Sequence, residues 1–330
     1  MRVTASPDAG YTGAHSPRLK AARRLTKRAF RQRERAFLAE GPQAVAEAFH
    51  CGTRVTDLFV TVPARSRHHD LITAMADAGI PVHVVSGEVM SELAQTVTPQ
   101  GLLAVCGFVD VPLSEITAPA PGLVALLANV RDPGNAGTVL RTADAAGAHA
   151  VVFADASVDP YNGKCVRASA GSLFHLPVVA GARLEDVVTA LRDVGLRIVA
   201  ADGRAGRSLD DPEVQARLAG PTAWMFGNEA WGLPPEVVAL ADESVAVPIY
   251  GRAESLNLAA AAAVCLYASA RAQRVHSEEG KGTWVGDKVV RKLATGGLEY
   301  LVYNMENSRL GTVTKPVYAL ESDHNPSPKP

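Results

Sequence analysis

The chain has 330 residues, of which 47% are hydrophobic and 20% charged, as in an ordinary soluble globular protein long enough for two domains. No run approaches the roughly 18 uninterrupted apolar residues of a membrane helix, and the first residues form no hydrophobic export signal. The four cysteines lack the close spacing that would indicate a zinc site or a redox pair; they are Cys51, Cys106, Cys165 and Cys265. We therefore expect a cytoplasmic protein with no membrane partner and no metal.

Positive charge is concentrated near the start of the chain, although the formal net charge is only -1. From Arg18 to Arg35 there are nine basic residues and one acid, Glu34. A local excess of this size is typical of a surface that binds phosphate groups. A solvated basic helix or a floppy arm would explain the same run, so the charge by itself leaves these interpretations open.

The first 111 residues alternate between helical and strand patterns after a short polar arm. Residues 1–16 are rich in Ser, Pro, Gly and Thr, which is typical of disorder. A helix is predicted from 17 to 39, where the Glu-Gly-Pro sequence at 40–42 breaks it. Further helices are expected at 43–49, 70–78 and 88–94, and strands at 55–62, 82–85 and 102–109. This pattern predicts a small α/β domain at 17–111, followed by a proline-rich linker at 112–121.

The alternation restarts after the linker and continues to residue 275. Strands are expected at 123–128, 150–153, 176–179, 197–201, 223–226 and 244–247, and helices at 136–146, 165–170, 184–194, 235–240 and 257–274. Strands that alternate with helices predict a mostly parallel sheet covered on both faces. The tail at 276–330 no longer shows the alternation, and we assign it no function.

The first polar cluster follows the first strand of this second part and begins at Asn129. It turns at Pro133 and Gly134 and is expected to begin a helix at Asn135, whose amide can cap the first turn. Arg141 lies about one and a half turns into that helix, and its long side chain can still reach the loops at the sheet edge. A capping asparagine and a surface arginine are the alternative, purely structural interpretation.

Two further clusters follow later strands and contain several glycines. Gly227 and its neighbouring glycines would let the backbone approach a ligand closely. Glu229 is the only acid of its strand and loop, and it either caps the loop or holds Arg141 or a substrate hydroxyl. Ser255 and Asn257 also have two interpretations, because either can cap the final helix.

Several common catalytic motifs are missing from the sequence. There is no Gly-x-Gly-x-x-Gly after the first strand of either part, and no Gly-x4-Gly-Lys-Ser/Thr, His-Glu-x-x-His or Gly-x-Ser-x-Gly anywhere. These absences exclude the usual dinucleotide, nucleoside-triphosphate, zinc-hydrolase and serine-hydrolase interpretations.

Three polar motifs therefore carry the functional signal, at 129–141, 226–233 and 247–257. In this order and spacing they resemble the signature motifs of the SpoU (TrmH) branch of the SPOUT RNA methyltransferases, and the resemblance covers about residues 20 to 274. The basic first domain resembles the ribosomal-protein-L30e-like RNA-binding domain of many members. Within the branch, the chain is most similar to the thiopeptide-antibiotic resistance enzymes, of the thiostrepton and nosiheptide type. Those enzymes act on one adenosine in the GTPase-centre hairpin of large-subunit rRNA.

The resemblance implies an α/β fold with an L30e-like N-terminal domain at 17–111 and a SPOUT domain at 122–275 that contains a trefoil knot. It also implies a homodimer that binds S-adenosylmethionine and methylates a ribose 2'-hydroxyl of 23S rRNA. The residues that would contact the cofactor, mainly through their backbone, are Gly227, Val247, Ile249 and Leu256. Arg141 would lie at the reacting hydroxyl, and the residues that would orient it or the substrate are Asn135, Glu229, Ser255 and Asn257. The residues expected to contact RNA are Arg23, Arg24, Lys27, Arg28 and Arg167.

Two other functions remain open at this point. The catalytic motifs do not encode the target, so the same chemistry on tRNA or at another rRNA site is one alternative. A non-catalytic rRNA-binding protein is the other, although binding alone would not require Arg141, Glu229 and Asn257. The role of Arg141 is open as well, because a guanidinium is normally always protonated. It would either accept the proton of the hydroxyl or stabilise the developing alkoxide.

Overall fold

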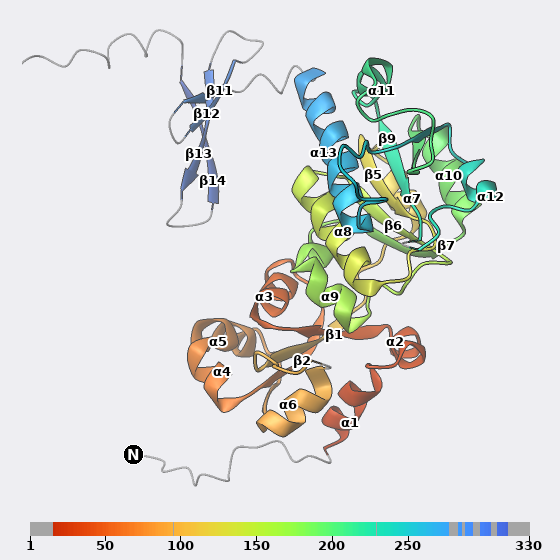
Figure 1. Cartoon of the computed structure of the whole chain (residues 1–330). Coiled ribbons are helices and arrows are strands. Elements are labelled where there is room, and N and C mark those ends of the chain that lie inside the picture. Colours follow the sequence, from red (N-terminus) through yellow and green to blue (C-terminus); the bar gives the residue numbers. More distant parts are fainter. Residues whose placement is uncertain are drawn as a thin grey trace, which may run out of the picture. The chain divides into compact units, whose positions relative to one another are not determined.

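The computed structural model describes residues 16–94, 96–228, 230–276, 283–285, 288–292, 298–304 and 309–315. These residues belong to two compact units, of which one ends at Ala270 and the other begins at Arg271. The larger unit contains two α/β domains (Figure 1).

The N-terminal domain is built on a sheet with the strand order β1-β4-β2-β3. Strand β4 pairs antiparallel with β1 and β2, while β2 and β3 are parallel. The strands are β1 (Ala36–Glu40), β2 (Val55–Val60), β3 (Val82–Val84) and β4 (Leu102–Gly107). The helices are α1 (Pro17–Arg24), α2 (Arg28–Glu34), α3 (Pro42–His50), α4 (Val62–Arg67), α5 (His69–Asp77) and α6 (Gly87–Ala94). Leu19 and Ala22 of α1 pack with Met90 and Leu93 of α6 in one buried cluster, so the basic segment is anchored by its apolar face.

The predicted single helix at 17–39 is wrong. The chain forms two short helices there, and α2 ends at Glu34, because its C-cap Arg35 adopts the left-handed conformation with φ 48°. The next five residues are strand β1, which pairs with β4 from Ala36 opposite Gly107 to Glu40 opposite Leu103. The alanine, leucine and glutamate in this strand are good helix formers, but helix propensity is weak and the buried sheet partner outweighs it.

The C-terminal domain contains a parallel sheet with the order β10-β8-β9-β5-β6-β7. The strands are β5 (Leu123–Leu127), β6 (Ala150–Ala154), β7 (Val178–Ala182), β8 (Arg197–Ala201), β9 (Thr222–Phe226) and β10 (Glu243–Val245). The helical segments are α7 (Leu113–Thr117), α8 (Pro133–Ala146), α9 (Gly163–Ser169), η1 (Ser172–Phe174), α10 (Leu184–Asp193), α11 (Pro212–Arg217), α12 (Pro235–Val238) and α13 (Leu258–His276). Every residue of β5, β6 and β9 is buried, as expected for central strands covered on both faces. The predicted α/β architecture is therefore confirmed.

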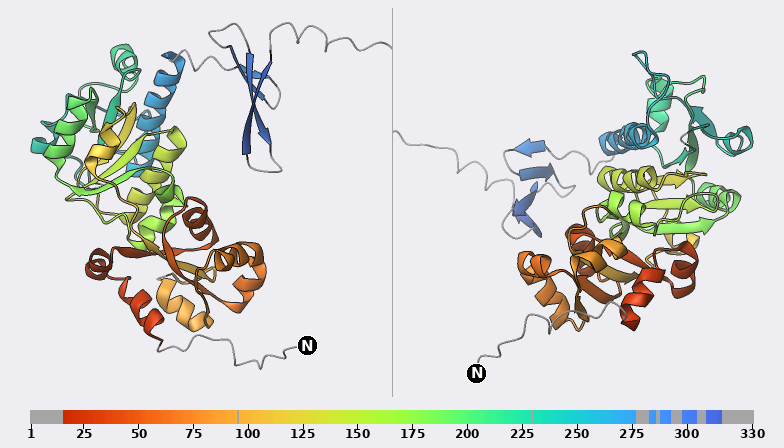
Figure 2. Two further views of the ribbon diagram at one scale, coloured as in Figure 1. Left: turned by 180° about the vertical axis from the view of Figure 1, so that it is seen from behind. Right: turned by 60° about the horizontal axis from the view of Figure 1, so that its bottom comes forward.

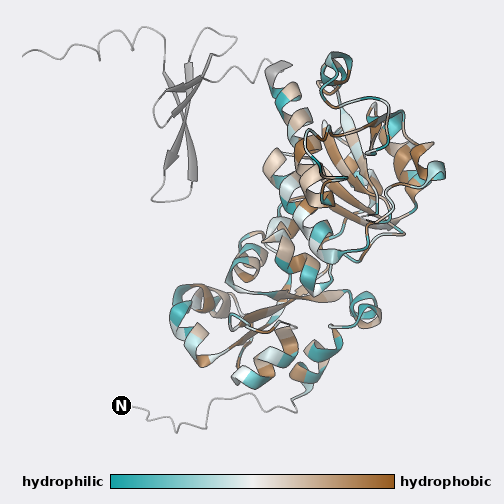
Figure 3. Cartoon of the chain, in the orientation of Figure 1, coloured by the Kyte–Doolittle hydropathy of each residue, from teal (hydrophilic) through white to brown (hydrophobic). Residues whose placement is uncertain are grey.

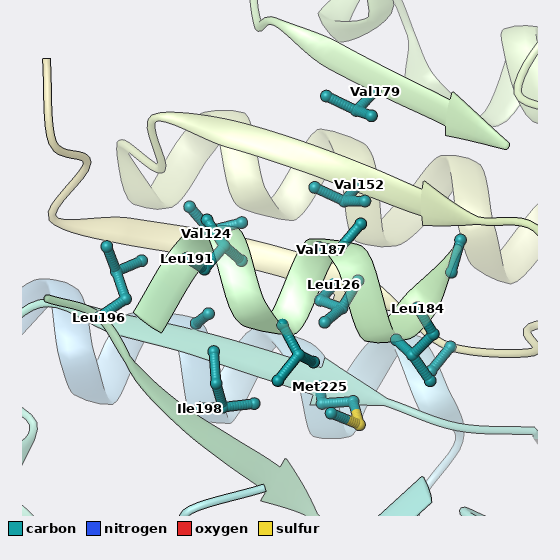
Figure 4. Packing of buried hydrophobic residues seen from close by; sticks show 14 of the residues in the cluster. Val124, Leu126, Val152, Val179, Leu184, Val187, Leu191, Leu196, Ile198 and Met225 are labelled. Carbon is teal, nitrogen blue, oxygen red and sulfur yellow. The ribbon is translucent and has the colours of Figure 1, made fainter. Parts of the chain in front are cut away.

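One face of this sheet packs against α10. Alternate residues of the strands, Val124 and Leu126 of β5 and Met225 of β9, meet Val187 and Leu191 of α10 in a continuous buried cluster (Figure 4). The period of two along each strand places these side chains on the same face. In Figure 3 the strands are largely hydrophobic, while hydrophilic residues mark the helices around them.

The opposite face of the sheet is covered by α8 and α13, which lie side by side in the views of Figures 1 and 2. Trp224 of β9, between the α10-facing residues Ala223 and Met225, is fully buried on this face, and its indole Nε1–H donates to Ser269 Oγ of α13 at 2.8 Å. Both groups are buried, so this hydrogen bond satisfies two polar atoms that would otherwise destabilise the core. Helix α13 is thereby fixed against the central strand.

Buried polar contacts join the two domains of the larger unit. Arg31 of α2 donates from Nε and Nη2 to Asp159 Oδ2 at 2.9 and 2.7 Å, and both side chains are almost fully buried. Arg167 of α9 donates to Glu40 Oε2 at 2.6 Å and to the carbonyl of Ala94 at 3.0 Å. The N-terminal domain therefore packs directly against the loop after β6 and against α9.

The segment predicted as a linker contains helix α7, and α4 and α11 were also not predicted. Each has only five or six residues, too few to show a helical period in the sequence. The second unit contains an antiparallel meander that was not predicted. Its strands are β11 (Thr283–Val285), β12 (Lys288–Lys292), β13 (Leu298–Asn304) and β14 (Arg309–Lys315). Among the described helices, none combines the length and apolar character that crossing a membrane requires.

Candidate active site

The first two polar motifs meet at the carboxyl ends of two neighbouring strands. Strands β5 and β9 pair in parallel, and the ladder continues beyond them, because Ala128 N–H donates to the carbonyl of Phe226 at 2.8 Å. Asn129 follows β5 in the left-handed conformation, with φ 67°, and its carbonyl accepts from Asn228 Nδ2 at 3.4 Å. Ligands of open α/β sheets bind at such strand ends, so this edge is the candidate site.

Asp132, and not Asn135, caps helix α8. Its Oδ1 accepts from the backbone N–H of Asn135 at 2.8 Å, and its Oδ2 accepts from Lys164 Nζ at 2.6 Å. The hydrogen bond from Lys164 lowers the pKa of Asp132. Partial burial opposes this effect, and the backbone N–H groups of Asn135 and Gly134 add to it. The prediction that the Asn135 amide caps the helix was therefore wrong, and the amide makes a different contact.

That contact joins the first motif to the third. Asn257 Nδ2 donates to Asn135 Oδ1 at 3.1 Å, although the two residues are 122 positions apart. Asn257 Oδ1 meanwhile accepts from the backbone N–H of Ala259 at 2.9 Å, which satisfies a free donor of the first turn of α13. The capping role suggested by the sequence and the bridging role thus use different atoms of one side chain.

Arg141 is exposed on α8. Its side chain makes no hydrogen bond or ion pair with another residue that the structure describes. Its helix runs parallel to α13, since Tyr267 Oη donates to the carbonyl of Ala145 at 3.3 Å while Asn257 contacts Asn135 further back. The guanidinium is therefore free of the described protein groups and can contact a substrate.

The loop after β9 is a tight turn. Asn228 N–H donates to the Gly232 carbonyl at 3.0 Å, and Gly232 N–H donates back to the Asn228 carbonyl at 2.9 Å. A Cβ at Gly227 would lie 2.7 Å from the carbonyl carbon of Gly232 and from Leu233 Cγ, so only glycine fits there. Glu229, predicted to orient the substrate, lies outside the described residues.

The third motif follows β10 and is largely exposed. Val247 is half-buried, Ser255 is exposed, and the apolar residues Ile249 and Leu256 are 38% and 40% exposed. Exposed aliphatic side chains beside a polar site are suited to cover an adenine ring. The predicted contact of the Gly227 backbone with the cofactor needs a residue without a side chain, so that the cofactor can approach closely. These residues fit the cofactor that the resemblance implies, and their individual contacts stay predictions.

The basic segment presents part of its charge to solvent. Five of its arginines pair with acids, and those pairs are Arg18 with Asp57, Arg23 with Glu92, Arg31 with Asp159, Arg33 with Glu34 and Arg35 with Asp110. Arg24 stacks on Phe30 with 5.5 Å between the guanidinium carbon and the ring centroid. Lys27 and Arg28 are exposed and have no acidic partner in the described part of the chain. The charge that remains for phosphate groups is thus concentrated at the turn between α1 and α2.

Arg167, predicted to contact RNA, lies at the junction of the two domains, where Glu40 is its partner. Its Nη1 makes both the ion pair and the hydrogen bond to the Ala94 carbonyl, which gives Arg167 a structural role in the described molecule. Lys164 and Asp159 could not be predicted, because their partners Asp132 and Arg31 are distant in the chain and no local motif marks them.

Known families match both domains. Residues 122–267 match the SpoU rRNA Methylase family, and residues 16–104 match the MRM3-like substrate binding domain. The chain is 34% identical over 254 residues to the 23S rRNA (guanosine(2553)-2'-O)-methyltransferase RlmP of Bacillus subtilis, covering 77% of this chain and 96% of that protein. It is 32% identical to the 23S rRNA (guanosine-2'-O-)-methyltransferase RlmB of Bordetella pertussis, covering 69% of this chain and 93% of that protein.

A solved structure agrees with these relatives. The AdoMet-bound rRNA methyltransferase from Sinorhizobium meliloti superposes with a TM-score of 0.68 at 31% identity, covering 79% of this chain and 97% of that one. An N-terminal substrate-binding domain followed by a methylase domain, with polar motifs at the strand ends, defines a two-domain RNA methyltransferase. The chain belongs to the SpoU rRNA methylase family. It is an RNA 2'-O-methyltransferase, and S-adenosylmethionine is its methyl donor.

Proposed function

We propose that this chain methylates the 2'-hydroxyl of one ribose in 23S rRNA, and that the site is formed by the ends of α8 and α13. The hydrogen bond between Asn135 and Asn257 carries the proposal, because it joins two motifs that are far apart in sequence. Arg141 extends from the same helix without a described protein partner. A binding protein without catalysis would have no need for this arrangement.

The bound cofactor would supply an electrophilic methyl group. Gly227, Val247, Ile249 and Leu256 are the residues that would hold it, inside the trefoil knot that we propose for this domain. The proposed boundaries are 17–111 for the RNA-binding domain, 112–121 for the linker and 122–275 for the methyltransferase domain. A cytoplasmic location follows from an rRNA substrate.

Arg141 would act on the reacting hydroxyl. Methyl transfer needs the 2'-oxygen held in line and about 3 Å from the methyl group, so positioning contributes much of the rate. A guanidinium stays protonated, so the role its chemistry supports is stabilisation of the developing alkoxide, while a neighbouring phosphate of the RNA or water would accept the hydroxyl proton. Arg141 or the ribose would be oriented by Asn135, Ser255 and Asn257. Glu229, which lies outside the described residues, would contribute to the same role.

The base of the target nucleotide has two candidates. The resemblance to thiopeptide-resistance enzymes predicts an adenosine of the GTPase centre, and modification there would confer resistance to those antibiotics. The names of the two curated relatives favour a guanosine of 23S rRNA instead. Identity to them extends over most of both chains, so we rank the guanosine target first and the adenosine second.

The active form is proposed to be a homodimer. Two large hydrophobic side chains are exposed on α13, three positions apart. They are Val264, which is 42% exposed, and Tyr267, which is 49% exposed. A second copy would cover this stripe, which lies beside the exposed face of α8 that carries Arg141. In such a dimer the site would receive residues from both chains.

Methylation of defined RNA tests the function. The full chain would be incubated with S-adenosylmethionine labelled in the methyl group and with 23S rRNA, tRNA, or a GTPase-centre fragment, and the modified nucleotide would be mapped. We expect one 2'-O-methylated nucleotide in 23S rRNA. Label in tRNA alone would contradict the proposed substrate, and no label in any RNA would favour the non-catalytic alternative. Light scattering during size-exclusion chromatography would test the dimer.

A further inference from the structure

A cluster of metal-binding side chains lies outside the methyltransferase site, where the two domains of the larger unit meet. Glu47 of α3 and Cys51, the C-cap of that helix, are one turn apart in the N-terminal domain, and His175 follows η1 in the C-terminal domain. The carboxylate oxygen, the thiol sulfur and the imidazole nitrogen that they offer all lie within 4.8 Å of one another. Oxygen, sulfur and nitrogen donors together are the set that Zn²⁺ accepts.

The imidazole of His175 is already oriented as a metal ligand would be. Its Nδ1 is 2.8 Å from Asp144 Oδ2, and its Nε2 is 3.1 Å from Glu47 Oε2. A histidine that binds a metal almost always donates its other ring N–H to a carboxylate, which fixes the ring and the tautomer. Asp144 is placed to accept from Nδ1, and Nε2 then points at Glu47 and the metal position.

The position of Glu47 is set by a glycine of the other domain. Gly171 has φ +98°, and a Cβ built on it would lie 2.6 Å from Glu47 Cγ. A side chain at this position would push Glu47 away from His175. The close packing of α3 on Gly171 therefore holds the carboxylate in the cluster.

We propose that Glu47, Cys51 and His175 bind one Zn²⁺ ion, with Asp144 orienting the imidazole and water at the fourth position. Ligand atoms of a tetrahedral zinc site lie about 3.5 Å apart, from metal–ligand distances of about 2.0–2.3 Å. Nε2 of His175 and Oε2 of Glu47 are already 3.1 Å apart, and no pair of the ligand atoms is more than 4.8 Å apart, so small side-chain rotations would bring the set to this spacing. The ion would tie α3 to the C-terminal domain, so its role is structural. No sequence motif marks the cluster, because His175 lies 128 positions beyond Glu47 in the chain.

Cobalt binding tests the proposal on the intact chain. After treatment with a chelator, the protein would be titrated with Co²⁺, whose bond to a thiolate produces a charge-transfer absorption band. We expect one equivalent to bind with this band. Zn²⁺ should displace the cobalt, since it forms the more stable complex with such ligands.

Matched variants and a second measurement complete the test. Cys51→Ser should abolish the band, and His175→Gln should weaken binding at least about tenfold, since loss of even an outer partner costs about 10–100-fold. His69→Gln, which changes an exposed histidine beside Asp70, should bind as the wild type does.

Cys51 is the only exposed cysteine of the four, so alkylation of the native chain reports on it directly. Zn²⁺ at 100 times its Kd should slow that alkylation about 100-fold. Wild-type protein that shows no band and no protection, or equal binding by the Cys51→Ser variant, would overturn the proposal.

Discussion

Asn257 donates through Nδ2 to Asn135 Oδ1 at 3.1 Å, and accepts through its own Oδ1 from Ala259 N–H at 2.9 Å. One side chain thus caps α13 and joins that helix to α8. The two functions can be separated by substitution, because they use different atoms of the amide.

Replacement of Asn257 by aspartate should separate folding from catalysis. Aspartate is as good an N-cap as asparagine, but it has no N–H to donate to Asn135. We expect the Asn257→Asp chain to keep its free energy of unfolding within about 0.5 kcal/mol while methyl transfer falls, and the Asn257→Ala chain to lose about 1 kcal/mol as well. Urea unfolding and methyl incorporation would be measured on both. An active Asn257→Asp enzyme would remove Asn257 from the proposed site.

Arg141→Ala should leave cofactor affinity nearly unchanged and reduce the rate of methyl transfer. Loss of one group that stabilises a developing oxyanion costs about 10²–10³ in rate. The comparison is Arg183→Ala, which removes an arginine whose side chain is 69% exposed and lies elsewhere on the surface. Calorimetric titration with S-adenosylmethionine and single-turnover methylation give the two readouts. A rate within about threefold of the wild type would exclude a catalytic role for Arg141.

Charge reversal at the turn between α1 and α2 should weaken RNA binding and flatten its salt dependence. Arg24, Lys27 and Arg28 are the residues to change, since Arg23 is paired with Glu92 at 2.5 Å. Each lost phosphate contact should reduce the slope of log K against log salt by about 0.7–0.9. Arg18→Glu, at a residue already paired with Asp57, serves as the comparison and should affect the slope less. An unchanged slope in the triple variant would leave this segment as a solvated face.

Removal of Arg31 should destabilise the larger unit strongly. The side chains of Arg31 and Asp159 are 5% and 4% exposed, so Arg31→Met would leave a buried carboxylate without its partner. The expected cost is about 3–5 kcal/mol, and the double change Arg31→Met with Asp159→Leu should recover part of it. Arg33→Met, at an exposed pair with Glu34, should cost less than about 1 kcal/mol. Equal losses for Arg31→Met and Arg33→Met in chemical unfolding would contradict this account.

Acid should remove a contribution of Asp132 to stability. The Lys164 hydrogen bond lowers the pKa of Asp132, so the folded state favours the carboxylate. The stabilisation is present at pH values above the ordinary aspartate pKa of about 3.9 and is lost as the pH falls through the lowered pKa. Asp132→Asn keeps an N-cap but does not titrate, so its free energy of unfolding should fall less steeply with acid. Identical pH profiles for the two chains would show that this ion pair does not contribute.

The class of fold and the three motifs can be predicted from local patterns in the chain. Buried strands such as β5 and β9 are continuous apolar runs, and the glycines and amides that end them are visible in the chain. Local signals of this kind need no knowledge of distant partners. They also placed most helices correctly, because an amphipathic period of several turns is encoded within the segment itself.

Which residues contact each other depends mostly on segments that are far apart in the chain. Strand β1 was predicted as helix because its residues favour helix locally, and the pairing with β4, more than sixty residues away, overrides that preference. Asn135 was expected to cap its own helix, but Asp132 does so and Asn135 contacts Asn257. Arg167, expected at the RNA, pairs with Glu40. The Asp132 cap is local, but the partners β4, Asn257 and Glu40 are far away in sequence, and the free energy of those contacts exists only once the chain has folded.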